Sequence, residues 1–270
     1  MRACWLRCAA HDPAPEIRIA SLVPSLTELL VALGLAPWLV ARTGFCIHPA
    51  AAVASIPKIG GTKDVNLAKL RRLAPSHVLV NVDENRLETV TALREFVPNI
   101  VVTHPNAPQD NLALLDQMLA LFGHLPGVAD RAAALRRALE NELAACAARP
   151  WPARRVLYLI WRAPWMTVAR DTYIARMLAQ VGWQTWPPVE GGEHGAARYP
   201  ALNGDEPWLA GIDELLLSSE PYRFDASHLA EVQVLCPNAR VRLVDGELLS
   251  WYGPRAAPGL AYLRRLATQG

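Results

Sequence analysis

The strongest constraint on the fold is an internal repeat, because the second half of the chain repeats the order of predicted elements seen in the first. Each half begins with a predicted strand followed by a helix, and each later carries a Pro-Asn turn before a strand. Three pairs of landmarks lie about 137 residues apart: Ile19 and Val156, Glu84 and Glu220, Pro98 and Pro237. A constant offset across unrelated landmarks predicts two homologous lobes rather than one long sheet.

Short apolar runs alternate with helical patterns through the first half. Strands are predicted over 17–23, 39–41, 77–82 and 99–104, and helices over 25–34, 66–74 and 86–96. Ser25 and Glu28 fit a capping box at the start of the first helix. Alternation at this spacing is typical of parallel sheets wrapped by helices. We therefore expect an α/β fold of two Rossmann-like lobes with central parallel sheets, joined by one long backbone helix.

That joining helix is predicted between the lobes. Residues 129–149 are rich in Ala, Leu, Arg and Glu, contain no glycine or proline, and carry Leu135, Leu139 and Leu143 on one stripe. Such a helix is about 30 Å long and permits rocking of a few degrees rather than wide closure. We place the first lobe at 17–124, the linking helix at 125–150 and the second lobe at 151–270.

Composition excludes several classes of protein. The chain has 270 residues, 52% of them hydrophobic and 19% charged, and a net charge of +2, so we expect a globular protein without a nucleic-acid partner. No run approaches the roughly 18 apolar residues of a membrane helix, so no membrane insertion is expected. The odd number of cysteines, five, argues against a disulfide framework. No export signal is visible at the N-terminus, which predicts a cytoplasmic location, or a periplasmic one if the start is truncated.

Three segments carry a resemblance to a known family. They are VPSLTELLVALGL, GGTKDVNLAKLRRLAPSHVLVN and DGELLSWYGPR, in this order and on either side of the long helix. Over residues 17–268 the chain resembles the class III periplasmic binding proteins, also called helical-backbone metal receptors, and is closest in pattern to the vitamin B12-binding members. The resemblance implies a ligand between two lobes, and family members bind corrinoids, siderophores, haem or metal ions.

The sequence departs from this family at the positions that serve transport. Each lobe of a family member usually presents a glutamate that docks on the membrane permease, and the corresponding positions here are assigned to Ala68 and Gly253. Together with the missing export signal, these departures make docking on a permease doubtful.

The ligand site is expected at the loops that follow the carboxyl ends of the parallel strands. Indole rings offer large apolar faces, Arg162 could bind a carboxylate, and the acidic and amide side chains could meet amide donors or a cation. His48 is also a candidate metal ligand. The predicted ligand-binding residues are Phe45, His48, Asp83, Glu84, Asn85, Trp161, Arg162, Trp165, Glu220, Tyr222, Trp251 and Tyr252.

Each of these residues also has a structural interpretation. Trp161 and Trp165 could fill the core between the lobes, the acids at 83, 84 and 220 could cap helices, and His48 could hydrogen-bond within its loop. The glycine-rich segment 190–208 could be a flap over the cleft or a surface connection.

We therefore predict a protein that binds a cobalamin-like corrinoid or another metal chelate in the interlobe cleft, cytoplasmic and not feeding a transporter. The alternative is an exported substrate-binding component of an ABC importer for cobalamin, haem or an iron siderophore. No nucleophile elbow, phosphate loop or HExxH pattern is present, so no enzyme is expected. Cobalamin or another chelate is then the ligand, and no resident cofactor is predicted.

Overall fold

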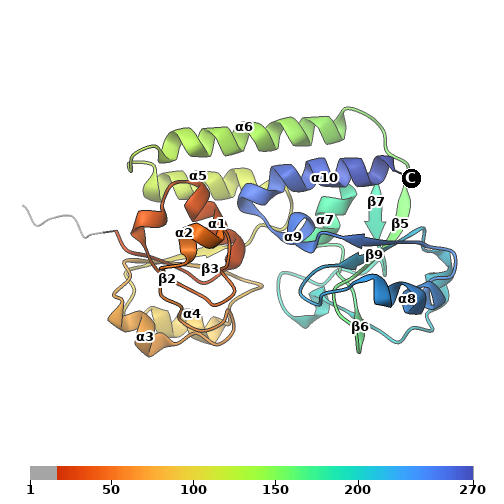
Figure 1. Cartoon of the computed structure of the whole chain (residues 1–270), viewed down its shortest axis with the longest axis horizontal. Helices are drawn as coiled ribbons and strands as arrows, with labels where there is room; N and C mark the ends of the chain where they lie inside the picture. Colours follow the sequence, from red (N-terminus) through yellow and green to blue (C-terminus); the bar gives the residue numbers. More distant parts are fainter. Residues whose placement is uncertain (1–16, 270) are drawn as a thin grey trace, which may run out of the picture.

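The computed structural model describes residues 17–269 and contains two lobes, each built on a four-stranded parallel sheet (Figure 1). The first sheet has the order β2-β1-β3-β4, with strands β1 Ile19–Ser21, β2 Leu39–Arg42, β3 His77–Asn81 and β4 Asn99–Thr103. The second has the order β7-β5-β9-β10, with strands β5 Arg154–Leu159, β7 Trp183–Thr185, β9 Glu214–Ser218 and β10 Arg240–Val244. Corresponding strands occupy the same positions in both sheets, so the predicted α/β fold is confirmed.

Helices cover these sheets. Those of the first lobe are α1 Pro24–Ala32, α2 Ala50–Val53, α3 Leu67–Arg72, α4 Leu87–Leu93 and α5 Asp110–Phe122. Those of the second are α7 Tyr173–Ala179, α8 Leu229–Leu235, α9 Gly246–Ser250 and α10 Ala256–Thr268. A small antiparallel ribbon, β6 Trp165–Met166 and β8 Ala201–Leu202, is added to the second lobe.

Local signals explain where several of these helices begin. The side chain of Asn66 accepts a hydrogen bond from the backbone N–H of Lys69, as a helix cap does. The capping box predicted at Ser25 is wrong, because α1 already begins at Pro24 and no side chain caps it. Proline lacks an N–H and its fixed φ suits the first helical turn, so the chain enters the helix one residue earlier.

The linking helix α6 spans Val128–Ala147 and crosses over both lobes beside α5 and α10 (Figure 1). Arg264 of α10 is tied to it, since Nη2 lies 2.7 Å from Oε2 of Glu142. The single long helix predicted from the sequence is therefore confirmed, while the domain boundaries drawn around it stay a prediction.

One hydrophobic core runs through both lobes. It includes Leu26 and Phe122 from the first lobe, Leu139 from α6, and Tyr173 and Leu260 from the second. Separate clusters fill the opposite face of each sheet. A shared, close-packed core resists sliding of one lobe against the other.

Two of the predictions from composition concern membrane helices and cysteines. Within residues 17–269, no helix is long and apolar enough to cross a membrane. Cys46, Cys146 and Cys236 are free and buried, whereas Cys4, Cys8 and the N-terminal segment examined for an export signal lie outside the described residues.

Candidate ligand site between the lobes

The carboxyl ends of the two sheets face each other across the gap between the lobes. Several contacts join the loops at these ends: Nε2 of His48 lies 3.5 Å from Oε1 of Glu247, and Nη2 of Arg198 donates to Oδ1 of Asn106 at 2.6 Å. Arg255 of the second lobe also pairs with Glu28 of the first, with 2.6 Å between Nε and Oε2. The predicted loops therefore meet at one place in the molecule.

Exposed apolar side chains gather on these same loops. Nine large hydrophobic side chains of the described residues are exposed, and five of them follow the carboxyl end of a sheet strand: Phe45, Ile47, Val82, Trp161 and Val189. Phe45 is 65% exposed and Trp161 is 41% exposed. A gathering of exposed apolar groups is a common mark of a binding surface.

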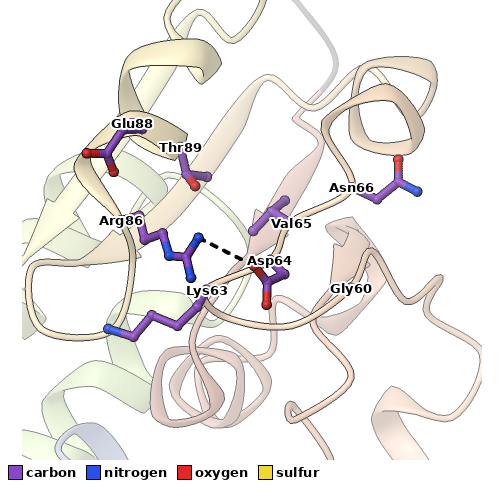
Figure 2. Close-up of a pocket in the computed structure, with 8 residues that line it drawn as sticks. All are labelled: Gly60, Lys63, Asp64, Val65, Asn66, Arg86, Glu88 and Thr89. Carbon is purple, nitrogen blue, oxygen red and sulfur yellow. Dashed lines mark ion pairs between the residues drawn. The ribbon is translucent and has the colours of Figure 1, made fainter.

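A concave region lies on the first lobe alone (Figure 2). This pocket of about 630 Å³ is formed at the starts of α3 and α4, where Asp64 pairs with Arg86 at 3.5 Å. Most of its lining residues are polar or charged types, and the predicted ligand residues are not among those that form it. It is therefore distinct from the loops that meet between the lobes.

Trp161 and Trp165 pack among aromatic residues of their own lobe. The ring of Trp161 meets Tyr222 edge-on with 5.6 Å between centroids, and Trp165 stacks on Phe224 at 6.3 Å. Neither indole belongs to the core that runs through both lobes, so the alternative in which they fill that core is wrong. Trp161 keeps a free face, whereas Trp165 is half-buried.

Arg162 is already engaged within its own lobe. Its guanidinium makes a two-pronged contact with Glu231 of α8, with Nε 2.9 Å from Oε2 and Nη2 3.2 Å from Oε1. Both side chains are exposed. A ligand carboxylate would have to displace Glu231 before it could bind Arg162.

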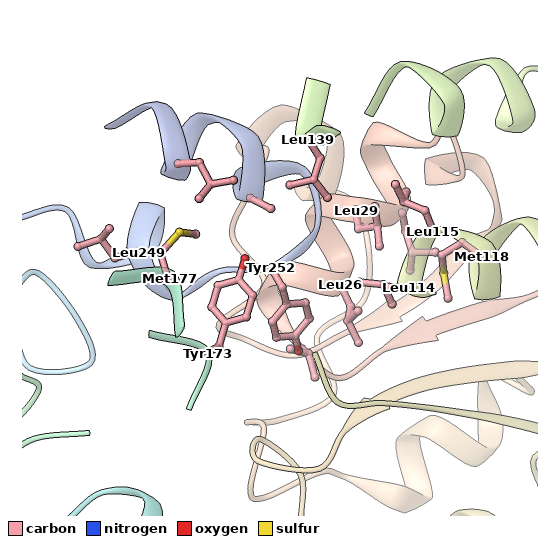
Figure 3. Close-up of a cluster of buried hydrophobic side chains, with 14 of the residues drawn as sticks. Leu26, Leu29, Leu114, Leu115, Met118, Leu139, Tyr173, Met177, Leu249 and Tyr252 are labelled. Carbon is pink, nitrogen blue, oxygen red and sulfur yellow. The ribbon is translucent and has the colours of Figure 1, made fainter. Parts of the chain in front are cut away.

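Two predicted ligand residues are buried, which corrects their assignment. Tyr252 is 7% exposed and its ring packs against Tyr173, with 6.0 Å between centroids, inside the shared core (Figure 3). Asn85 holds its own loop, because Oδ1 accepts from the N–H of Asn81 and Nδ2 donates to the carbonyl of Thr62. Both side chains support the fold rather than a ligand surface.

The acidic residues of the first lobe face the second lobe. Oδ1 of Asp83 lies 3.1 Å from Nε of Arg198, and Oδ2 lies 3.5 Å from Nε2 of His104. Burial raises the pKa of Glu84, and the charge of Asp83 adds to that rise while Lys63 opposes it. The helix that follows begins after Arg86 without a side-chain cap, so the predicted capping role of these acids is wrong.

Glu220 orients Trp251 in the second lobe. Its Oε1 accepts hydrogen bonds from Oγ of Ser250 at 2.6 Å and from Nε1 of Trp251 at 2.7 Å, and the indole meets the ring of His48 with 5.8 Å between centroids. Burial raises the pKa of Glu220, and the nearby charges of Glu247 and Glu84 raise it further. Glu220 therefore lies within electrostatic reach of an acid from the other lobe.

The raised pKa of Glu220 predicts a pH-dependent stability. Because the folded protein favours the protonated form, the contribution of Glu220 is fully present below its ordinary pKa of 4.5 and is lost as the pH rises through the raised value. Glu220→Gln keeps an acceptor for both donors without the charge. We expect the variant to be more stable than the parent at pH 7, with the difference shrinking towards pH 4, in urea titrations across this range. A variant less stable at pH 7 would contradict the assignment.

His48 has no cluster of metal ligands around it. Among residues 17–269, no group of three or more His, Cys, Asp or Glu side chains is arranged to hold a metal ion. Its neighbours are Glu247 and Trp251. His48 could act on a metal only as a single ligand to a chelate that brings its own donors.

Sequence reasoning missed one charged residue at this place. Arg198 lies in the glycine-rich segment, yet it is buried and contacts Asp83 and Asn106 of the first lobe. The segment reads as irregular, with β8 and a 3-10 turn over Ala196–Arg198 as its main regular structure. Its sequence carries no periodic signal that would point to a buried arginine.

The chain has two duplicated α/β lobes joined by one long helix, and its strand-end loops carry exposed aromatic side chains. These features are those of a two-lobed ligand-binding protein. The family model described as "Periplasmic binding protein" matches residues 19–203, more than half of the chain. The chain therefore belongs to the periplasmic binding protein family, and the predicted ligand-binding role is confirmed at this level.

Solved structures with the same fold cover both lobes. The periplasmic vitamin B12-binding protein of Vibrio cholerae matches with a TM-score of 0.75 and 18% identity, covering 95% of this chain and 99% of that one. A periplasmic haem-binding protein from Pseudomonas aeruginosa gives 0.71 and 24%, covering 94% and 93%. An ABC transporter substrate-binding protein from Listeria monocytogenes gives 0.74 and 16%, covering 94% and 100%. No curated protein sequence matches the chain.

Proposed function

We propose that this protein is the substrate-binding component of an ABC importer and holds a small molecule between its lobes. The observation that carries the proposal is that exposed apolar side chains, Phe45 and Trp161 among them, lie on loops after the carboxyl ends of strands in both sheets. Family membership and the similarity to periplasmic proteins favour this alternative over the cytoplasmic, non-transporting role first predicted.

The glycine at position 253 has a packing reason of its own. Its φ is +81°, a conformation that strains residues with a side chain, and a Cβ there would lie 3.2 Å from Cβ of Leu29. A glycine at this position is therefore weak evidence against a permease partner. Ala68 is exposed on α3, where a docking surface would be accessible.

The charged side chains of the loops between the lobes indicate which class of ligand they suit. Arg162, Arg198 and Arg255 are each paired with carboxylates of the protein. By contrast, Glu84 forms no ion pair among the described residues, although the charge of Lys63 acts on it, and Glu220 is held by neutral donors only. Partly desolvated carboxylates without a directly paired cation favour a ligand that brings N–H donors. This supports a cobalamin-like corrinoid, which carries amide groups, over haem, which carries two carboxylates.

A ligand titration tests the proposed ligand class, and cell fractionation tests the importer role. Purified protein is titrated with cyanocobalamin, haemin and a ferric siderophore while its Trp fluorescence is followed, and cell fractions are probed for the protein. Saturable quenching by cyanocobalamin, with weaker or absent quenching by haemin, is expected, together with a periplasmic pool. Tighter binding of haemin would overturn the ligand class, and a purely cytoplasmic pool would overturn the importer role.

Trp161→Ala is expected to weaken guest binding by about 10- to 50-fold, because the exposed indole offers a large rigid apolar face. The same fluorescence titration measures this change. Val234→Ala is the control, since Val234 is 82% exposed on α8 and is not among the predicted ligand residues. Equal affinities of the two variants would remove Trp161 from the site.

A further inference from the structure

Two central loops of the second lobe bring an exposed arginine beside an exposed indole. Residues 160–164 follow β5 and residues 219–224 follow β9, and these two strands occupy the middle of the second sheet. The ring of Trp161 in the first loop meets the ring of Tyr222 in the second, with 5.6 Å between centroids. Arg162 follows Trp161 directly, and the side chain of Tyr222 lies beside its guanidinium. A ligand that lies on Trp161 is therefore close to Arg162.

Glu231, on a separate element, occupies the binding edge of this arginine. It belongs to the first turn of α8, and its Oε2 lies 2.9 Å from Nε of Arg162 while its Oε1 lies 3.2 Å from Nη2. A carboxylate of a ligand would use the same two-pronged geometry on a guanidinium. Glu231 thus fills the place that such a carboxylate needs and puts a negative charge there.

The exposure of this pair argues against a mainly stabilising role. The side chains of Arg162 and Glu231 are 43% and 44% exposed. An ion pair so open to water contributes little to stability, because solvent screens both charges and two long side chains lose freedom. The buried pair of Arg242 and Glu214 in the same lobe is less than one-tenth exposed. What the pair at Arg162 can affect is the binding of charged groups beside Trp161.

We propose that Glu231 sets the specificity of the ligand site against carboxylates. The proposal rests on the proposed function, because it concerns the same ligand. By keeping Arg162 occupied, Glu231 leaves the second lobe suited to neutral amide groups, whereas a carboxylate must break the pair and meets a like charge. Discrimination of this kind weakens the wrong ligand instead of strengthening the right one. Glu231 is therefore a specificity residue that need not touch the accepted ligand.

A gain of carboxylate binding tests the proposal. Glu231→Ala frees Arg162 and keeps a strong helix former in α8. We expect the Kd for haemin to fall about 5- to 10-fold, because an exposed pair no longer competes and a like charge is gone. The Kd for haemin dimethyl ester, which lacks both carboxylates, and that for cyanocobalamin should change less than about 2-fold. Titrations followed by Trp fluorescence at about 0.15 M salt measure all three.

Matched variants show whether the gain depends on Arg162. Glu231→Ala/Arg162→Met should lose the gain, since no guanidinium is freed. Glu231→Ala/Arg223→Met should keep it, because Arg223 is an exposed arginine of the same loops that does not pair with Glu231. Glu95→Gln removes a carboxylate from the exposed pair with Arg71 on the first lobe and should leave the affinity for haemin unchanged.

The result for haemin decides the proposal whether or not cyanocobalamin binds the parent. No gain in Glu231→Ala, or an equal gain for the dimethyl ester, would overturn it. Weaker binding of both porphyrins would show that Glu231 only supports the loop, which also overturns it. If the gain appears and requires Arg162 while cyanocobalamin does not bind the parent, the proposed ligand class fails and the role of Glu231 stands.

Discussion

Tyr252→Ala should lower the free energy of unfolding by about 3–5 kcal/mol, the cost typical of removing a large buried aromatic side chain. Tyr252 lies in the core that runs through both lobes, where its ring meets Tyr173 (Figure 3). Leu26 and Leu29 of the first lobe belong to the same cluster. The substitution therefore opens a cavity between the lobes and weakens the contact that joins them. Urea unfolding followed by Trp fluorescence measures the loss.

Tyr252→Phe is the matched control for this substitution. The hydroxyl of Tyr252 is buried without a hydrogen-bond partner among the described residues. The hydroxyl lies near Ser25 and Thr103 without a well-formed hydrogen bond to either, so Tyr252→Phe should stay within about 1 kcal/mol of the parent. A loss below about 1 kcal/mol for Tyr252→Ala would show that the lobes do not share a packed core at this point.

The sequence predicts the sheets well because buried parallel strands are short, continuous apolar runs. The repeat is visible for the same reason, since β3 and β9 begin at His77 and Glu214 and lie at equivalent positions of the two sheets. Helix starts are less well predicted: Asn66, included in the predicted helix, is the residue that caps α3. The capping box predicted at Ser25 is absent, because Pro24 occupies the first turn of α1.

The site is less predictable, because neighbouring residues in a loop can have opposite environments. Trp251 is half-buried beside His48, whereas Tyr252 is in the core. Composition alone does not separate them. Arg198 is harder still, because its partner Asn106 is 92 residues away and nothing periodic surrounds it. Strand-end geometry therefore locates the loops, while only the packed structure shows which side chains face the gap.

The second large effect is expected at a buried ion pair within the second sheet. Arg242 of β10 and Glu214 of β9 form a two-pronged contact, with Nε 2.9 Å from Oε2 and Nη2 3.3 Å from Oε1. Nη1 also donates to the carbonyl of Leu266 near the end of α10. Both charged side chains are less than one-tenth exposed. The pair thus joins the edge strand, its neighbour and the last helix.

Glu214→Gln should destabilise the protein by about 3 kcal/mol, because it leaves the guanidinium of Arg242 buried without a counter-charge. Glu95→Gln is the control, since Glu95 pairs with Arg71 on the surface and should cost less than about 0.5 kcal/mol. The double variant Glu214→Leu/Arg242→Met should recover most of the loss, because it removes both charges together. A double variant no more stable than Glu214→Gln would show that the hydrogen bond from Arg242 to α10, rather than the ion pair, holds this edge of the sheet.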